Sequence, residues 1–136
     1  MAHFSEAESL GLAATAPIGR IVYSRYALPA VFLVNFRLDG RDPVFRTRKG
    51  SMFGAAVAET VVAFEVDRVD EQSHDGWYVT FLGRAKLITD PAEQIRLAGL
   101  GIDPWAPGER DHFVKIVTER VLGRRIAHHL DDGSED

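Results

Sequence analysis

The segment ALPAVFLVNFRLDGRDPVFRT, residues 27–47, constrains the fold of this chain more than any other. An apolar run over residues 30–38 is followed by an Asp-Gly-Arg-Asp turn at 39–42 and by a second run over residues 43–47. Two strand-like runs on either side of an Asp-Gly turn are typical of an antiparallel β-hairpin. We therefore expect a hairpin here, and a largely antiparallel sheet around it.

Four further segments have the pattern of β-strands: residues 18–25, 60–70, 77–89 and 112–126. In the second of these, Val62, Phe64 and Val66 alternate with polar residues, which predicts one buried face. Gly83 interrupts the third and indicates a bulge or bend. About six strands, some long and bent, predict a mainly β protein whose sheet forms a closed or nearly closed barrel with few exposed edges.

Three short helices are expected between the strands. Ser5 and Glu8 have the spacing of a capping box at the start of the first helix. A second short helix is expected from Ser51 to about Ala58. Asp90 is placed as the N-cap of the third helix, because a proline follows it at the first helical position.

The composition is that of one domain, for which we expect residues 1–127, followed by a polar and disordered tail over residues 128–136. The chain has 136 residues, no cysteine and a formal net charge of −4. The charge argues against a general nucleic-acid binder, and the absence of cysteine fits a reducing compartment. No apolar run approaches the ~20 residues of a membrane span, and the segment MAHFSEAES lacks the pattern of a signal peptide. We therefore expect a cytoplasmic protein that binds neither nucleic acid nor membrane.

Positive charge is concentrated at the turn between the strand ending near residue 45 and the helix expected from residue 51. The six residues of this turn are Arg46, Thr47, Arg48, Lys49, Gly50 and Ser51. Cations and hydroxyls beside a helix N-terminus form a plausible phosphate site. The spacing is not that of a Walker loop. The alternative interpretation is a solvated basic turn in which Ser51 is a simple N-cap.

Two other residues could belong to a ligand site. Asn35 lies inside an apolar strand, where its amide needs hydrogen-bond partners. It could bind the polar rim of a ligand or satisfy a bulge. Trp105 lies between two prolines on a loop and could stack on a planar ligand, cover a partner subunit or fill its own end of the barrel.

Other chemistries have no support in the sequence. The five histidines show no metal-ligand spacing, so we predict no metal site. No G-x-S-x-G motif is present, so nucleophilic hydrolysis is not indicated. Glu65 and Asp67 alternate along one strand, and we interpret them as a solvated outer face.

Seven segments together resemble the pyridoxamine 5′-phosphate oxidase-like proteins, also called split-barrel flavin proteins. They are PIGRIVY, FLVNF, VFRTRKGS, VAFEVDRVD, GWYVTFLGRAKLITDP, PWAPGERDHFVKI and VLGRRI, in this order over about residues 5–126. The resemblance implies a six-stranded antiparallel split β-barrel with short helices. It also implies a homodimer with flavin at the subunit interface. The usual cofactor is FMN, and some relatives use a deazaflavin.

The resemblance also implies a phosphate site at the basic turn. Arg46 and Thr47 match the strand-end residues at the FMN phosphate, and Lys49 and Ser51 complete the turn. Many relatives carry a lysine at the position of Met52. That departure implies a substitute role for Lys49, a weaker grip on the phosphate or a different preferred ligand.

The remaining implied contacts are to the flavin ring. Val34, Asn35 and Phe36 match the strand beside the isoalloxazine. Trp105 and Arg110 would approach the ring from the other subunit. Together these matches would make the chain an FMN-dependent oxidoreductase that transfers hydride or electrons to a small-molecule substrate. We assign no catalytic acid or base, because hydride transfer through the flavin need not use one.

Three alternatives stay open at this point. The chain could be a deazaflavin-dependent reductase, or a flavin-binding protein without turnover, such as a carrier or sensor. A barrel that only dimerises through its apolar face is the interpretation without a flavin.

Overall fold

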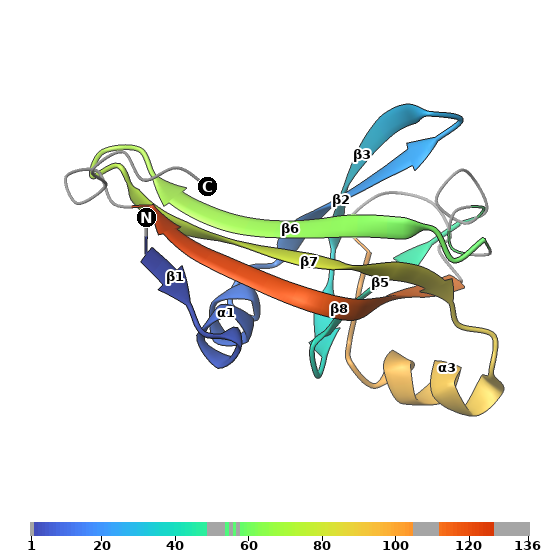
Figure 1. Cartoon of the computed structure of the whole chain (residues 1–136). Helices are drawn as coiled ribbons and strands as arrows, with labels where there is room; N and C mark the ends of the chain where they lie inside the picture. The colour runs from blue at the N-terminus through green and yellow to red at the C-terminus, as the bar shows by residue number, and fades with distance from the viewer. Residues whose placement is uncertain (1, 49–53, 55, 57, 105–111, 127–136) are drawn as a thin grey trace.

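The computed structural model describes residues 2–48, 54, 56, 58–104 and 112–126 (Figure 1). Along the chain, these residues form β1 (Ala2–Phe4), α1 (Glu6–Ala13), β2 (Ile18–Arg25), β3 (Leu28–Asn35), β4 (Arg37–Asp39), β5 (Asp42–Thr47), β6 (Val61–Asp70), β7 (Asp75–Leu87), α3 (Pro91–Ala98) and β8 (His112–Ile126).

The strands form one antiparallel sheet with the order β3-β2-β6-β7-β8-β5-β4, and β1 pairs with the end of β8. β3 and β4 lie at opposite ends of this order, although only Phe36 separates them in the chain. The sheet must therefore curl until its two edges approach each other. This is the split β-barrel that the sequence predicts, and Figure 1 shows the long strands β6, β7 and β8 along its length.

The strand count differs from the six that we expected, since the described residues form eight strands. The expected strand 30–38 is divided at Phe36, whose amide donates to the carbonyl of Pro17 at 3.3 Å. β1 was not predicted. It is only three residues long, and its place is fixed by pairing with β8, where Phe4 lies opposite Gly123.

Two tight hairpins connect the strands at the curled edges. Gly40 and Arg41 join β4 to β5, and Gly40 has a φ of 65°, as the Asp-Gly signal predicts. Tyr26 and Ala27 join β2 to β3 with φ values of 52° and 65°. Two positive φ angles in a two-residue loop match the right-handed twist of the strands, but glycine or asparagine usually supplies them. The β2–β3 hairpin projects away from the long strands (Figure 1).

The bulge predicted at Gly83 is confirmed. The register between β7 and β8 shifts between Leu82 and Gly83. A Cβ atom at Gly83 would lie only 2.1 Å from the carbonyl oxygen of Val117, which belongs to the neighbouring backbone. Glycine is thus required here because the two strands approach closely.

Aromatic side chains fill the inside of the curled sheet. Phe64 lies in their centre, with the ring of Phe36 5.0 Å away and that of Phe81 6.2 Å away, both edge-on. Phe45 stacks on it at 6.3 Å. The alternation expected of β6 is confirmed, because its three apolar residues on this face are buried.

The opposite face of the sheet carries an apolar row that no described residue covers completely. Val31, Val22, Ala63 and Leu82 lie in register across β3, β2, β6 and β7. We call these four residues the outer row. Val31 is 57% exposed, and Leu33 on the same strand is 67% exposed. The sheet therefore has a second apolar surface outside the core.

The two described helices begin where the sequence predicts. Ser5 Oγ accepts a hydrogen bond from the amide of Glu8 at 3.1 Å, and Glu8 Oε1 accepts one from the amide of Ser5 at 2.9 Å. These bonds lower the pKa of Glu8. Asp90 Oδ2 accepts from the amide of Glu93 at 3.2 Å. Neither helix is long and apolar enough to cross a membrane, and the described part of the chain contains no other candidate.

Two expectations fall mainly outside the described residues. Of the short helix expected over residues 51–58, Gly54 and Ala56 are described as helical, and the amide of Ala58 donates to the carbonyl of Gly54 at 3.1 Å. The tail over residues 128–136 lies entirely outside them.

Candidate functional site

Half of the predicted site residues can be placed in the fold. Val34, Asn35 and Phe36 end β3 and follow it, and Arg46 and Thr47 end β5. The other predicted positions lie outside the described residues; they are Lys49, Ser51, Met52, Trp105 and Arg110. The site therefore has to be built from the ends of β3, an edge strand, and of β5, which is next to the strand at the other edge of the curled sheet.

Asn35 is half-buried at the end of β3. Its side-chain Nδ2 donates to the backbone carbonyl of Asp103 at 2.7 Å. The partner that a mid-strand amide requires is thus partly supplied by the loop that follows α3. Sequence alone left open whether Asn35 satisfies a bulge or faces a ligand, and the structure shows one backbone partner for it.

Arg46 is half-buried at the end of β5. Its Nη1 donates to the backbone carbonyl of Ile102 at 3.2 Å. Its guanidinium carbon lies 5.6 Å from the ring centroid of Phe113, its partner on β8. The ring and the loop together fix the direction of a long cationic side chain at this edge.

Asn35 and Arg46 therefore converge on consecutive carbonyls, those of Asp103 and Ile102. They are brought together because the sheet curls and because the loop after α3 crosses between the strand ends. This loop leads directly to Trp105 in the sequence. We call Asn35, Arg46 and the loop residues Ile102 and Asp103 the strand-end site.

Thr47 is next to Arg46, but it leaves the opposite face of the strand, as successive residues do. It is buried, and its Oγ1 donates to the carbonyl of Arg48 at 3.1 Å. Arg48 is exposed. Arg46 and Thr47, the first two residues of the predicted basic turn, thus point to opposite faces of β5.

The side chains of Val34 and Phe36 contribute packing. Phe36 is buried in the aromatic core, and Val34 packs against that core while remaining partly exposed. Of these two, only Val34 has an accessible side chain. The predicted contacts of Val34, Asn35 and Phe36 with a flavin ring stay predictions.

An ion-pair network holds α3 and its loop in place. Asp39 at the β4–β5 turn accepts from Arg96 Nη1 at 2.9 Å, from Arg96 Nη2 at 2.6 Å and from Lys115 Nζ at 2.7 Å. Glu93 also pairs with Arg96. The hydrogen bonds from Arg96, and then from Lys115, hold the pKa of Asp39 well below its usual range.

Sequence analysis missed this network. Only the i,i+3 spacing of Glu93 and Arg96 on one helix could have been noticed. A small apolar cluster around Val44, Leu97 and Ile102 packs α3 and the loop onto β5 beneath it. Both features position the carbonyls that Asn35 and Arg46 contact.

The outer face carries another polar cluster, which sequence analysis interpreted as solvated. Arg20 Nη1 lies 3.1 Å from Glu65 Oε1 and 2.7 Å from Asp67 Oδ2; the two carboxylates are partly buried, and Arg20 is exposed. Burial, together with the neighbouring Asp67, raises the pKa of Glu65 to about 7. The signal was missed because Arg20 and Glu65 meet only through the pairing of β2 with β6.

The strand-end site combines the amide of Asn35 with the guanidinium of Arg46, and the Thr47 hydroxyl lies on the opposite face of β5. A guanidinium suits a phosphate, while an amide can donate to or accept from the edge of a polar ring. Among residues 2–48, 54, 56, 58–104 and 112–126, no group of three or more His, Cys, Asp or Glu side chains is placed to hold a metal ion. The donor set fits a phosphorylated heteroaromatic ligand.

Comparison with known proteins identifies the class. The curled sheet is that of a split-barrel protein, and the family model described as pyridoxamine 5′-phosphate oxidase matches residues 5–125. The chain belongs to this family, which confirms the resemblance seen in the sequence.

Three relatives show how close the similarity is. The uncharacterized protein Rv0080 of Mycobacterium tuberculosis H37Rv is 38% identical over 125 residues, which are 88% of this chain and 81% of the relative. The structure of an FAD-binding protein from Mycobacterium smegmatis has a TM-score of 0.79 at 26% identity, covering 94% of this chain and 100% of that one. A Corynebacterium diphtheriae protein of unknown function, DIP1874, has a TM-score of 0.75 at 30% identity, covering 93% and 98%.

Proposed function

We propose that this chain is a flavin-binding oxidoreductase that uses FMN to reduce or oxidise a small-molecule substrate. The observation that carries the proposal is the convergence of Asn35 and Arg46 on the loop carbonyls of Asp103 and Ile102, in a chain of this family. These residues bring hydrogen-bonding groups from strands far apart in the order of the sheet to one place. Membership of the family and similarity to a protein described as FAD-binding support a flavin as the ligand.

Each side chain has a separate task in this proposal. Arg46 binds the phosphate by a charge-assisted hydrogen bond, and the Thr47 hydroxyl and the basic turn with Lys49 and Ser51 complete that contact. Asn35 hydrogen-bonds the edge of the ring and fixes its orientation. The flavin supplies the redox chemistry when it is bound, whereas the protein binds, orients and electrostatically tunes it.

We further propose that the protein is a homodimer and that the partner subunit completes the flavin site. The outer row and its neighbour Leu33 expose apolar surface on the side of the sheet opposite the core. Exposed, contiguous apolar surface of this kind commonly marks an interface. A second copy that covered it could bring Trp105 and Arg110 to the ring, as the family resemblance implies.

The dimer can be tested by sedimentation velocity. The wild-type protein is expected to sediment as a dimer and the Leu33→Lys variant as a monomer, because a lysine would place a charge in the interface. Ile95→Lys is the matched control, since Ile95 is 75% exposed but lies on α3. A monomeric wild-type protein would contradict the proposal.

The choice of flavin follows from the phosphate site. We propose FMN, because the sequence predicts one phosphate site at the basic turn. FAD is the alternative that the M. smegmatis relative supports, and a deazaflavin is the alternative that the family resemblance implies.

The absence of cysteine in the chain supports a cytoplasmic location for the protein.

The test is a set of equilibrium titrations with FMN, FAD and a deazaflavin, followed by absorbance. Saturable binding with FMN as the tightest ligand is expected. Preference for FAD or for the deazaflavin would replace FMN as the proposed cofactor, and absence of binding to all three would overturn the proposal. Reduction of bound FMN by NADH or NADPH with turnover of an acceptor would then distinguish an enzyme from a flavin carrier or sensor.

A further inference from the structure

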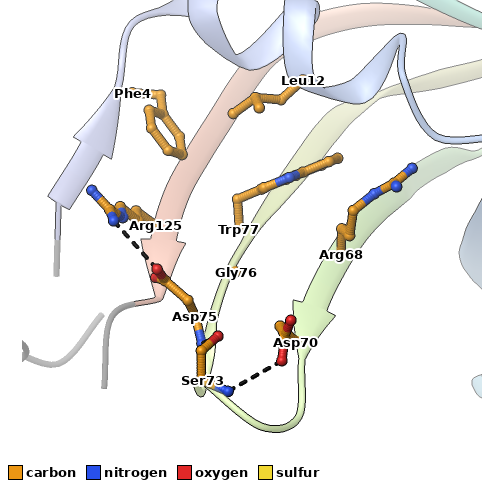
Figure 2. A pocket seen from close by; sticks show the side chains of 9 residues that line it. All are labelled: Phe4, Leu12, Arg68, Asp70, Ser73, Asp75, Gly76, Trp77 and Arg125. Atoms are coloured by element: carbon orange, nitrogen blue, oxygen red, sulfur yellow. Dashed lines mark hydrogen bonds and ion pairs between the residues drawn. The ribbon is translucent and has the colours of Figure 1, made fainter. Parts of the chain in front are cut away.

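A hollow of about 510 Å³ lies at the end of the sheet where β6 turns into β7. In Figure 2, Phe4 of β1 and Leu12 of α1 point toward β7 from the helix side, and Trp77 rises between the strands. Trp77 packs against the main core, which fixes its ring. The volume is within the range that small-molecule sites occupy, and the lining combines Phe4, Leu12 and Trp77 with four charged side chains and Ser73.

Two arginines flank the tryptophan. The register of the sheet pairs Arg68 of β6 with Trp77, and Trp77 with Arg125 of β8. The three side chains therefore leave the same face in one row across three strands. A flat ring placed on Trp77 would have a guanidinium on either side of it.

Some polar side chains of the hollow make few or long hydrogen bonds within the protein. Arg68 Nη2 donates to the carbonyl of Thr15 at 3.2 Å. Arg125 Nη2 donates to Asp75 Oδ2 at 3.4 Å, which is a long contact. The Asp75 side chain is 47% exposed, so its carboxylate can be reached from the hollow. A carboxylate held only by one long contact can accept a further hydrogen bond from a ligand.

The charges in the hollow balance. Two guanidinium groups, those of Arg68 and Arg125, face two carboxylates, those of Asp70 and Asp75. Asp70 is already engaged, because its Oδ1 accepts from the amides of Gln72 at 2.9 Å and Ser73 at 3.1 Å. A neutral lining favours a neutral ligand that presents both donors and acceptors, since an ion would leave one sign of charge uncompensated.

We propose that this hollow binds a neutral, planar heteroaromatic compound with N–H donors and a carbonyl acceptor on its ring, the chemistry of a guanine-type nucleobase. The ring stacks on Trp77 between Phe4 and Leu12. Its N–H edge donates to the exposed part of the Asp75 carboxylate, and its carbonyl accepts from Arg68.

The hollow is separate from the strand-end site. Arg46 pairs with Phe113 near the start of β8, whereas Arg125 is the second-last residue of that strand. Twelve residues of extended strand span up to about 40 Å. Ligand binding in the hollow is therefore independent of the proposed flavin site.

The test is a titration of the full-length protein with guanosine, observed at Trp77. The chain has two tryptophans, so the Trp105→Phe variant leaves Trp77 as the only one. Saturable quenching of its fluorescence is expected, with a dissociation constant below about 1 mM. Isothermal titration calorimetry on the wild-type protein, with and without saturating FMN, should give the same guanosine affinity in both cases.

The Asp75→Asn variant tests the role of the Asp75 carboxylate directly. It should weaken guanosine binding at least tenfold, while Glu119→Gln, which removes an exposed carboxylate elsewhere on β8, should leave the affinity unchanged. Circular dichroism should show the same thermal transition for both variants. Absence of guanosine binding, equal affinity of the Asp75→Asn variant, or binding of benzoate in preference to guanosine would each overturn the proposal. Competition between FMN and guanosine would also overturn it, because the two sites would then be one.

Discussion

Replacing Glu65 with glutamine should remove part of the pH dependence of the free energy of unfolding. Glu65 and Asp67 share the guanidinium of Arg20, and burial together with Asp67 raises the pKa of Glu65 to about 7. A carboxyl whose pKa is higher in the folded state than in the unfolded chain binds its proton more tightly when folded. Its favourable contribution is therefore complete below about pH 4.5 and is lost as the pH rises toward 7 and above.

The magnitude follows from the shift and from the exposure of the side chain. Without screening, a shift of this size corresponds to about 3 kcal/mol. The Glu65 side chain is 27% exposed, and its partner Arg20 is 44% exposed, so solvent screens the effect to about 1 kcal/mol. Glutamine removes the charge but leaves Arg20 paired with Asp67 at 2.7 Å. As the pH rises from 5 to 8, the free energy of unfolding of the Glu65→Gln variant should thus increase by about 1 kcal/mol relative to that of the wild type.

Urea unfolding at pH 5 and pH 8 measures this difference. All samples should be compared at one protein concentration, because the stability of the proposed dimer would depend on it. Glu119→Gln serves as the control, since the side chain of Glu119 is 69% exposed. An equal pH dependence of wild type and the Glu65→Gln variant would refute the reasoning.

Two further substitutions test the features that shape the sheet and position the loop. Gly83→Ala should lower the free energy of unfolding by about 2 kcal/mol, because the new Cβ would lie 2.1 Å from the backbone carbonyl oxygen of Val117; unchanged stability in urea would show that β7 and β8 can separate freely. Asp39→Asn should cost about 1 kcal/mol at pH 7 through weaker bonds to Arg96 and Lys115. Since the pKa of Asp39 is lowered, that cost should shrink as the pH falls below about 4, and a constant cost would contradict the assignment.

Sequence signals that act within a few residues predicted the structure well. The capping box of Ser5 and Glu8, the N-cap Asp90 and the turn at Gly40 depend only on neighbours along the chain, and all are present. The bulge at Gly83 was also predicted, because glycine inside a strand is costly unless the backbone needs it.

Features that depend on the curl of the sheet could not be predicted in this way. Asn35 and Arg46 meet a loop that is 68 and 56 residues away in the sequence. The pairing of Arg20 with Glu65 and the binding of Asp39 by α3 likewise require the finished fold. The sequence showed that a mid-strand Asn35 needs a hydrogen-bond partner, but which groups supply the partners of these residues is set by topology.

The placement of the flavin at the strand-end site is tested most directly by an FMN titration of wild type, Arg46→Ala and Arg125→Ala, followed by absorbance. The account predicts saturable binding to wild type and a loss of about 1.5–3 kcal/mol, roughly 10- to 150-fold in affinity, for Arg46→Ala. Arg125 lies at the other end of β8, so its replacement should leave FMN affinity unchanged. Equal affinity of wild type and Arg46→Ala, with both proteins folded by circular dichroism, would contradict the placement of the flavin at the strand-end site.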